Sequence, residues 1–432
     1  MHFARKATTN KIIEAIHEGR LDERLTEIYA DPYIIPYEKK RYEQALYQYN
    51  AMFGADEVEI FSAPGRSEIG GNHTDHQHGE VLAASINRDA IAIVKKLNRP
   101  RVTILSDGYA SEITVDIDDL DKRKSEEGTT AALIRGVLAK IQINGYSIGG
   151  FQAYITSDVL IGAGLSSSAA FETLIGTIVS YLYNNNEISA VEIAKIGQYA
   201  ENVYFGKPCG LMDQMACSVG SLVHINFADV KRPKIEQVQL DLDAHGYSLC
   251  ITDTKGSHAD LTPDYAAIPQ EMKQVAEFFG KEVLGEVSKQ EILRDIPQIR
   301  EKAGDRALLR AIHFMNENER VRQEAEALKQ DHFSEFLELV KESGNSSYKY
   351  LQNVYTSRYI RHQNLSVALA VSDMVLGKQG ASRVHGGGFA GTIQAFVPEN
   401  MVEDYREAME DIFGEGTCQV LKIRKYGGVK VL

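Results

Sequence analysis

The stretch FQAYITSDVLIGAGLSSSAAFETLIGTIVSYL, residues 151–182, decides the fold, because it joins a strand, a glycine-rich turn and a helix. Residues 151–156 alternate as in a strand, and from Ala170 onward apolar residues recur at helical spacing. The turn between them, Gly162–Ser168, therefore lies at a helix N-terminus, where unpaired amides and the helix dipole attract a phosphate. No Gly-Lys-[Ser/Thr] follows, so the turn is not a Walker A loop.

Two more segments are rich in glycine and small polar residues. The first is Ala63-Pro64-Gly65-Arg66 running into Gly71-Asn72-His73-Thr74-Asp75, and the second is Gly386-Gly387-Gly388-Phe389-Ala390-Gly391. Glycine lets backbone N–H groups approach an anion closely, and a hydroxyl such as Ser168 can reach the accompanying cation. Together the three segments indicate an enzyme that handles phosphate.

Composition limits the possible function classes. The chain has 432 residues, of which 44% are hydrophobic, so it can bury a large core in two domains. Its net charge of −13 argues against a nucleic-acid partner. No apolar run is long enough to span a membrane and the N-terminus lacks a signal-peptide core, so we expect a cytoplasmic protein. Four cysteines without a CxxC pair indicate neither a disulfide framework nor a zinc site.

The chain divides into three parts by pattern. Residues 1–52 are polar and helix-prone and are predicted to form an N-terminal helical extension on the surface. Residues 53–230 are predicted to form a first lobe that holds the Ala63–Asp75 and Gly162–Ser168 segments, and 231–432 a second lobe with the Gly386–Gly391 loop. The charged, proline-containing stretch after Val230 marks the boundary. Mixed strands and helices in two lobes predict an α+β fold with its active site in the cleft between the lobes.

Within the first lobe, the patterns predict individual elements. The expected strands are 58–62, 81–86, 90–96, 102–105, 113–117 and 151–156. A helix is expected at 130–143, and Ser189 with Glu192 forms a capping box that begins another.

Two other readings of the same residues are weaker. Gly145-Tyr146-Ser147-Ile148-Gly149 fits the nucleophile elbow of a serine hydrolase, and His385 with the glycines after it fits an oxyanion motif. That elbow requires a strand that leads into a helix, whereas here a helix leads into a strand. His73, Asp75, His76 and His78 could form a zinc cluster, but they lack a helical i, i+4 histidine pair.

Taken in order, the segments resemble those of the galactokinases, within the family of small-metabolite kinases named for galactokinase, homoserine kinase, mevalonate kinase and phosphomevalonate kinase. Gly65–His76 is similar to the galactokinase signature, and Gly164–Ala170 is similar to the GLSSSAA phosphate loop. Gly386–Gly391 resembles the GGGFGG loop, with Ala390 in place of a glycine, and Pro208–Gln214 resembles the MDQ segment. The matches span residues 53–397, and the first 50 residues extend beyond the usual family start.

The resemblance implies a two-lobed small-metabolite kinase fold and a set of site residues. ATP would lie on Gly162, Ala163, Gly164, Leu165, Ser166, Ser167 and Ser168, and Mg²⁺ on Ser168 and Glu201. Asp213 would be the base that accepts the proton of the sugar hydroxyl, with Arg66 beside it. The sugar would be bound by Asn72, His73, Asp75, Gly210, Tyr265 and Glu68.

One departure from the family concerns the sugar. Where galactokinases carry the glutamate that contacts the 6-hydroxyl end of the sugar, this chain has Asn72, and where they carry an asparagine it has Glu68. The resemblance implies ATP-dependent phosphorylation of the anomeric hydroxyl of galactose. The alternatives are a kinase for N-acetylgalactosamine or L-arabinose, and a non-catalytic sugar sensor. Sugar, ATP and Mg²⁺ are the expected small-molecule partners, and a monomer is expected.

Overall fold

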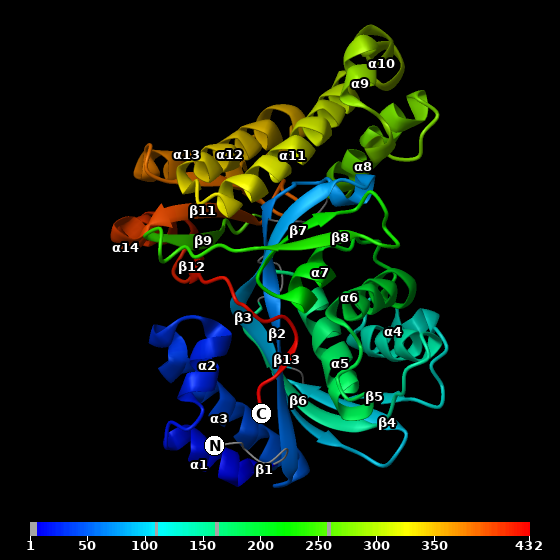
Figure 1. Cartoon of the computed structure of the whole chain (residues 1–432), viewed down its shortest axis with the longest axis vertical. Helices are drawn as coiled ribbons and strands as arrows, with labels where there is room; N and C mark the ends of the chain where they lie inside the picture. Colours follow the sequence, from blue (N-terminus) through cyan, green and yellow to red (C-terminus); the bar gives the residue numbers. More distant parts are fainter. Residues whose placement is uncertain (1–6, 109–110, 160–163, 257–260) are drawn as a thin grey trace.

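The computed structural model describes residues 7–108, 111–159, 164–256 and 261–432. Within these ranges, nine strands form one sheet and four form another, and helices cover both (Figure 1). The mixed, two-lobed α+β arrangement predicted from the sequence is confirmed.

The first sheet is built around two long antiparallel strands, β2 and β3, which run through the middle of Figure 1. Its path is β1-β2-β3-β6-β4-β5, with β13 paired to β2 and β7 and β8 continuing from β3. Its strands are β1 (Ala7–Thr8), β2 (Glu57–Gly70), β3 (Glu80–Lys96), β4 (Arg101–Ser106), β5 (Ile113–Asp116), β6 (Phe151–Ser157), β7 (Leu222–Asn226), β8 (Lys234–Val238) and β13 (Val429–Lys430).

Both faces of this sheet are covered by helices. Ile60 packs against the N-terminal helices, whereas its neighbour Phe61 points to the opposite face, so β2 is apolar on both sides. The N-terminal helices are α1 (Thr9–His17), α2 (Asp22–Tyr29) and α3 (Ile35–Phe53), and the opposite layer contains α4 (Thr130–Ile143), α5 (Ser167–Tyr183), α6 (Ala190–Tyr199) and α7 (Met212–Val219). The two layers lie on opposite sides of β2 and β3 in Figure 1.

The N-terminal helices are not a loosely attached surface layer. Leu25, Ile28, Tyr42, Leu46 and Tyr49 are fully buried against the sheet. The segment is helical as expected, but it is not confined to the surface, because isoleucines, leucines and tyrosines bury the inner faces of its helices.

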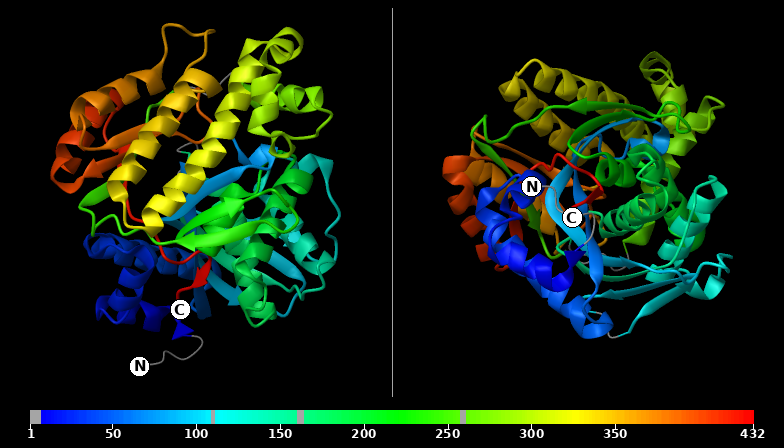
Figure 2. Two further views of the ribbon diagram at one scale, coloured as in Figure 1. Left: turned by 45° about the horizontal axis from the view of Figure 1, so that its top comes forward. Right: turned by 60° about the horizontal axis from the view of Figure 1, so that its bottom comes forward.

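The second sheet lies in the C-terminal half, in the order β10-β11-β9-β12, and every pairing in it is antiparallel. Its strands are β9 (Tyr247–Asp253), β10 (Ala381–His385), β11 (Thr392–Pro398) and β12 (Cys418–Leu421). The helices of this half are α8 (Thr262–Phe278), α9 (Lys289–Arg294), α10 (Ile296–Ala303), α11 (Asp305–Lys329), α12 (Phe333–Ser346), α13 (Asn364–Leu376) and α14 (Val402–Phe413). Figure 2 shows α11 and α12 as long yellow helices beside the long strands of the first sheet.

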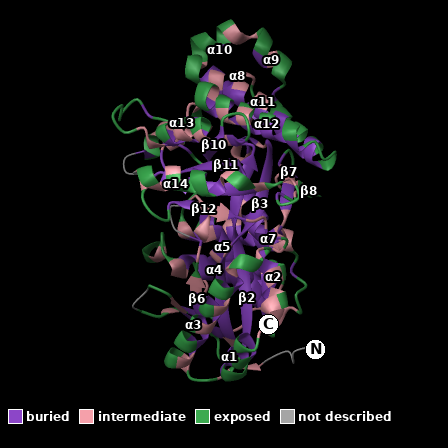
Figure 3. Cartoon of the chain, turned by 90° about the vertical axis from the view of Figure 1, so that its left-hand side faces the viewer, coloured by how far each residue is buried: buried purple, intermediate pink, exposed green. Residues whose placement is uncertain are grey.

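The first sheet extends past the boundary expected at residue 230. β8 pairs with β7, and β13 near the C-terminus pairs with β2. We therefore propose that the first lobe continues to Val238 and takes up the last residues of the chain. Strands that are buried on both faces run through the centre of the molecule, and exposed helix faces surround them (Figure 3).

Candidate active site

Arg66 and Asp213 form an ion pair at the centre of the predicted site. Arg66 lies in β2 and Asp213 in the first turn of α7. Arg66 Nε donates to Asp213 Oδ1 over 2.7 Å, and Nη2 donates to Oδ2 over 3.0 Å. The Arg66 side chain is buried, whereas that of Asp213 is 34% exposed. The two-pronged contact thus holds the carboxylate in one orientation with an edge open to solvent.

The surroundings of Asp213 keep its carboxylate ionised. Burial alone would raise its pKa, but attraction by Arg66 and hydrogen bonds from Arg66 and the Ser166 hydroxyl outweigh burial, so the pKa lies below its ordinary value. An ionised carboxylate can accept a proton from a hydroxyl placed within hydrogen-bond distance.

The predicted phosphate-binding segment lies directly against this pair. Helix α5 begins at Ser167, and Ser166 before it adopts a left-handed conformation with a φ of 61°. The Arg66 backbone N–H donates to Leu165 O over 3.1 Å, and its guanidinium donates to Gly164 O. Gly162 and Ala163 lie outside the described residues. The first amides of α5 are therefore beside the Arg66–Asp213 pair, at a place suited to a phosphoryl group.

Ser168 and Glu201, the predicted metal ligands, are in contact. Ser168 Oγ donates to Glu201 Oε1 over 3.0 Å, and Glu201 lies in a π-helical turn, Ala200–Phe205. Lys207 Nζ also donates to Oε1, over 3.3 Å. A hydroxyl and a carboxylate suit Mg²⁺, which takes few protein oxygens and completes its shell with phosphate and water. Among the described residues, no group of three or more His, Cys, Asp or Glu could hold a metal ion.

Asp75 and Gly210 are close together near Asp213. A Cβ built on Gly210 would lie 1.8 Å from Asp75 Oδ2, so a side chain at position 210 would displace the carboxylate. Burial, followed by the charge of Asp213, raises the pKa of Asp75 to about 6. Asp75 Oδ1 accepts the His76 backbone N–H over 2.9 Å, which leaves Oδ2 facing Gly210. This corner brings together two of the residues predicted to bind sugar.

Three other predicted sugar ligands hold the glycine loop. Asn72 Nδ2 donates to Gly386 O over 2.7 Å, and Tyr265 Oη donates to Gly388 O over 2.7 Å. His73 Nε2 lies 3.0 Å from Gly387 O, to which only a protonated ring nitrogen can donate. Burial lowers the pKa of His73, which favours the neutral ring. The structure thus connects the signature segment of the first lobe to the loop between β10 and β11 of the second.

The exchanged pair Asn72 and Glu68 is buried, at 0% and 3% exposure. Besides its bond to Gly386, Asn72 Nδ2 donates to Glu68 Oε1 over 3.0 Å. Asn72 Oδ1 accepts hydrogen bonds from Asn353 Nδ2 over 2.8 Å and from Ser347 Oγ over 3.2 Å. These four bonds are the full capacity of an amide. In this structure the Asn72 amide therefore has only protein partners, and Glu68 in turn accepts from Arg383.

The sequence analysis assigned no role to Glu172, or to Gln214 within the MDQ segment. Gln214 Nε2 donates to Glu201 Oε2 over 2.8 Å and to Glu172 Oε2 over 3.1 Å, so one amide connects the predicted metal ligand to a second carboxylate. Burial, then repulsion by Glu201, raises the pKa of Glu172 well above its usual value. The sequence carries a signal for Glu172, because it follows Ser168 by four residues. This spacing places both side chains on the same face of the helix.

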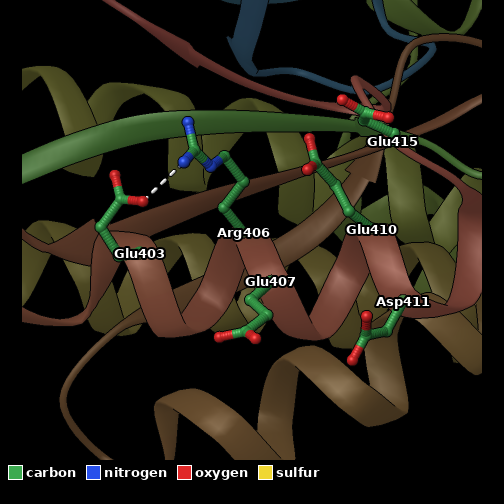
Figure 4. Close-up of a pocket in the computed structure, with 6 residues that line it drawn as sticks. All are labelled: Glu403, Arg406, Glu407, Glu410, Asp411 and Glu415. Carbon is green, nitrogen blue, oxygen red and sulfur yellow. Dashed lines mark hydrogen bonds and ion pairs between the residues drawn. The ribbon is translucent and has the colours of Figure 1, made fainter.

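A hollow along α14 lies apart from these residues. Figure 4 shows its six lining side chains, Glu403, Arg406, Glu407, Glu410, Asp411 and Glu415, with Glu403 and Arg406 paired over 2.6 Å. It contains no residue of the predicted site.

In the described part of the chain, no helix is long and apolar enough to cross a membrane.

Comparison with known proteins gives matches along most of the chain. Residues 132–221 match the model for the GHMP kinases N-terminal domain, and residues 47–96 match the galactokinase galactose-binding signature. A galactokinase of Glaesserella parasuis is 31% identical over 374 residues, which cover 86% of this chain and 93% of that protein. A galactokinase of Actinobacillus pleuropneumoniae is 29% identical, with 88% and 95% covered.

Among solved structures, the galactokinase of Lactococcus lactis in complex with galactose superposes with a TM-score of 0.75. It is 24% identical and covers 89% of this chain and 98% of its own. This similarity shows that the two chains share a fold. A mevalonate kinase superposes with a TM-score of 0.57 at 14% identity, with 85% of this chain and 99% of its own covered.

Proposed function

Because the chain belongs to the galactokinase family, we propose that it transfers the γ-phosphoryl group of ATP to the anomeric hydroxyl of galactose. The products are galactose 1-phosphate and ADP. As an ATP-dependent sugar kinase, the enzyme has to bring a hydroxyl, a base and the nucleotide phosphates together. The observation that carries the proposal is the Arg66–Asp213 pair, which lies against the N-terminus of α5 with the Asp213 carboxylate partly open to solvent.

The reaction needs little covalent chemistry from the protein. The sugar oxygen forms a bond to the γ-phosphorus, the bond from the γ-phosphorus to the bridging oxygen breaks, and Asp213 takes the hydroxyl proton. Because phosphoryl transfer passes through a loose transition state, the proton can leave late, and a carboxylate with a lowered pKa suffices as base. Arg66 keeps that carboxylate ionised and oriented, and its positive charge lies near the transferring group.

Ser168 and Glu201 are the residues that we propose to hold Mg²⁺. The ion would neutralise charge on the nucleotide phosphates when bound. Asp75, beside Gly210, is the proposed acceptor for sugar hydroxyls, and its closeness to Asp213 suits a sugar whose reacting hydroxyl points to that base. Because ATP is the phosphoryl donor, the proposal includes a cytoplasmic location.

A panel of free sugars tests the substrate. ADP release is measured with galactose, N-acetylgalactosamine, L-arabinose and glucose, and ³¹P NMR of the product identifies the phosphorylated oxygen. We expect galactose to have the highest kcat/KM and the product to be the anomeric phosphate. A higher kcat/KM for another sugar would assign the function to that sugar, and a phosphate on another carbon would refute the assigned roles.

A further inference from the structure

Arg41 of α3 connects the N-terminal helices to the strand that leads into the phosphate-binding segment. Its guanidinium is 7% exposed and lies among three carboxylates. Nη1 is 2.7 Å from Asp158 Oδ2 and 3.2 Å from Glu38 Oε2, and Nη2 donates to Asp89. Figure 2 shows the dark-blue N-terminal helices against the long strands of the sheet.

Asp89 and Asp158 differ in how many partners they have. Asp89 also accepts from Arg424 Nη1 over 2.9 Å, from Tyr29 Oη over 2.8 Å and from Ser62. Within the described parts of the chain, the Asp158 carboxylate accepts, besides Arg41, only the Tyr37 hydroxyl, over 3.0 Å. Both partners of the Asp158 side chain thus come from α3. Its backbone N–H donates to Asp89 O over 2.9 Å, which fixes its main chain to β3.

Asp158 lies where its position bears on the active site. It follows the last residue of β6 and precedes Val159, which is 2% exposed. A Cβ built on Gly65 would lie 3.0 Å from Val159 Cγ1 and 2.8 Å from Leu165 O. Val159 and Leu165 therefore pack against the same glycine of β2, Gly65, next to Arg66. Val159 and Leu165 lie at the two ends of the connection from β6 to α5. Both contact Gly65, the residue before Arg66.

We propose that Arg41 and Tyr37 are positioning residues for the nucleotide. By holding Asp158, they fix the end of β6 and Val159, and thereby the approach of the Gly164–Ser168 segment to Arg66. The proposal rests on the assigned role of that segment in binding phosphate, but it does not depend on which sugar is phosphorylated. It gives the helical segment before the family's usual start a role in ATP binding rather than in sugar recognition.

Two conservative variants test the proposal. Asp158→Asn keeps the shape of the side chain and removes its charge, and Tyr37→Phe removes only a hydroxyl from a residue that is 53% exposed. We expect the Kd for ADP, measured by calorimetry without sugar, to rise about 5–20-fold for Asp158→Asn and about 2–5-fold for Tyr37→Phe. The KM for ATP should rise with it, whereas the KM for galactose should stay within twofold.

Three further measurements separate positioning from general destabilisation. The loss of ADP affinity in the double variant should be smaller than the two single losses combined, since the Tyr37 hydroxyl acts through residue 158. Tyr47→Phe, the same change at a residue of α3 that is 51% exposed, is the matched control and should change nothing. The Tm of each variant should stay within a few degrees of the parent.

An unchanged ADP affinity in both single variants would overturn the proposal. So would a parallel loss of ADP and galactose affinity with a lower Tm, because that result indicates loss of structure. If Asp158→Asn does not fold, the ADP affinity of Tyr37→Phe compared with that of Tyr47→Phe still tests the proposal. A failure of galactose as substrate leaves the ADP measurement intact, so the two proposals can fail separately.

Discussion

Arg66 shows how one side chain connects several parts of the site. Its guanidinium binds both oxygens of Asp213 and the carbonyl of Gly164, and its backbone N–H binds Leu165 O. A lysine could not make these contacts, since it lacks the planar fork of donors. The proposed base Asp213 and the proposed phosphate-binding segment therefore have a fixed relation before any substrate arrives, and such positioning lowers the barrier to phosphoryl transfer.

The role of Asp213 predicts the effect of removing its charge. Asp213→Asn is nearly isosteric, so we expect the variant to fold and to bind galactose. An amide accepts a proton poorly, and kcat should fall about 10²–10⁴-fold. Rapid-quench or coupled kinetics would measure the loss, with Asp229→Asn at an exposed aspartate as the control. A kcat near that of the parent would rule out Asp213 as the base.

The hydrogen bonds of Asn72 predict how the enzyme treats the C6 end of the sugar. A site that binds a substrate hydroxyl through a buried polar group rejects the analogue that lacks it by about 10⁴–10⁵-fold. All four hydrogen bonds of the Asn72 amide go to protein groups, so we expect 6-deoxygalactose to lose only about 10-fold in kcat/KM. Competition between the two sugars in one reaction gives the ratio directly. A loss of several thousand-fold would show that another group binds the 6-hydroxyl.

Exchanging residues 68 and 72 tests whether they act together. Asn72→Glu places a carboxylate beside Glu68 and removes the donor to Gly386 O, so kcat/KM should fall at least about 10-fold. Adding Glu68→Asn restores one amide and one carboxylate, and we expect part of the loss to be recovered. Glu68→Asn alone should destabilise the fold, because it leaves the fully buried Arg383 guanidinium without its carboxylate. A double variant as impaired as Asn72→Glu would show that the two positions are independent.

Elements whose partners are close in sequence were predictable. The expected helix 130–143 has the bounds of α4, since Thr129 caps it by accepting the Ala132 N–H and its apolar residues keep one period. β3 was predicted as two strands, 81–86 and 90–96, with Asn87 and Asp89 between them. The strand continues there because distant groups satisfy both side chains: Asn87 Oδ1 accepts the Lys422 N–H, and Asp89 binds Arg41 and Arg424.

The site residues also divide into those that local patterns predict and those that they do not. The phosphate segment and its serines could be placed from residues 151–182 alone, because a strand, a glycine turn and a helix are local patterns. Apart from Glu68 in β2, the partners of the Asn72 amide are Ser347 in the π turn after α12, Asn353 beyond that turn and Gly386 after β10, at residues that no local pattern connects to position 72. The sequence therefore indicates which residues form the site but not that Asn72 is occupied by protein groups.

At the start of α5, the contact between Ser168 and Glu201 predicts the metal dependence. Ser168→Ala and Glu201→Gln should each raise the Mg²⁺ concentration for half-maximal rate, since Mg²⁺ takes only one or two protein oxygens and depends on each. Galactose affinity without nucleotide should hardly change. Ser180→Ala, at a buried serine further along the same helix, controls for loss of a hydroxyl. Unchanged Mg²⁺ titrations in both variants would show that the pair is structural.

For the whole molecule, the N-terminal helices contribute Arg41 and Glu38 to a charged cluster against the first sheet, as well as apolar packing. Arg41 and Arg424 carry two positive charges against the carboxylates of Asp89, Asp158 and Glu38. Charge balances when one carboxyl is protonated. Glu38 is fully buried, and its Oε2 lies 3.2 Å from Arg41 Nη1.

The cluster predicts how stability depends on pH. Burial is the main cause that raises the pKa of Glu38 to about 7, and Asp89 and Asp158 add to it while Arg41 and Tyr29 oppose it. Between pH 4.5 and 7 the folded protein thus holds a proton that the unfolded chain releases, so the contribution of Glu38 to stability falls as the pH rises through this window. Glu38→Gln removes the free-energy cost of ionising this buried carboxyl. It should raise the free energy of unfolding at pH 8 by about 2–3 kcal/mol and change it little at pH 5. Urea unfolding at both pH values measures this, with Glu14→Gln at an exposed position of α1 as control. If Glu38→Gln keeps the parent's difference between pH 5 and pH 8, another group holds the proton, and the charge balance beneath the sheet is set elsewhere.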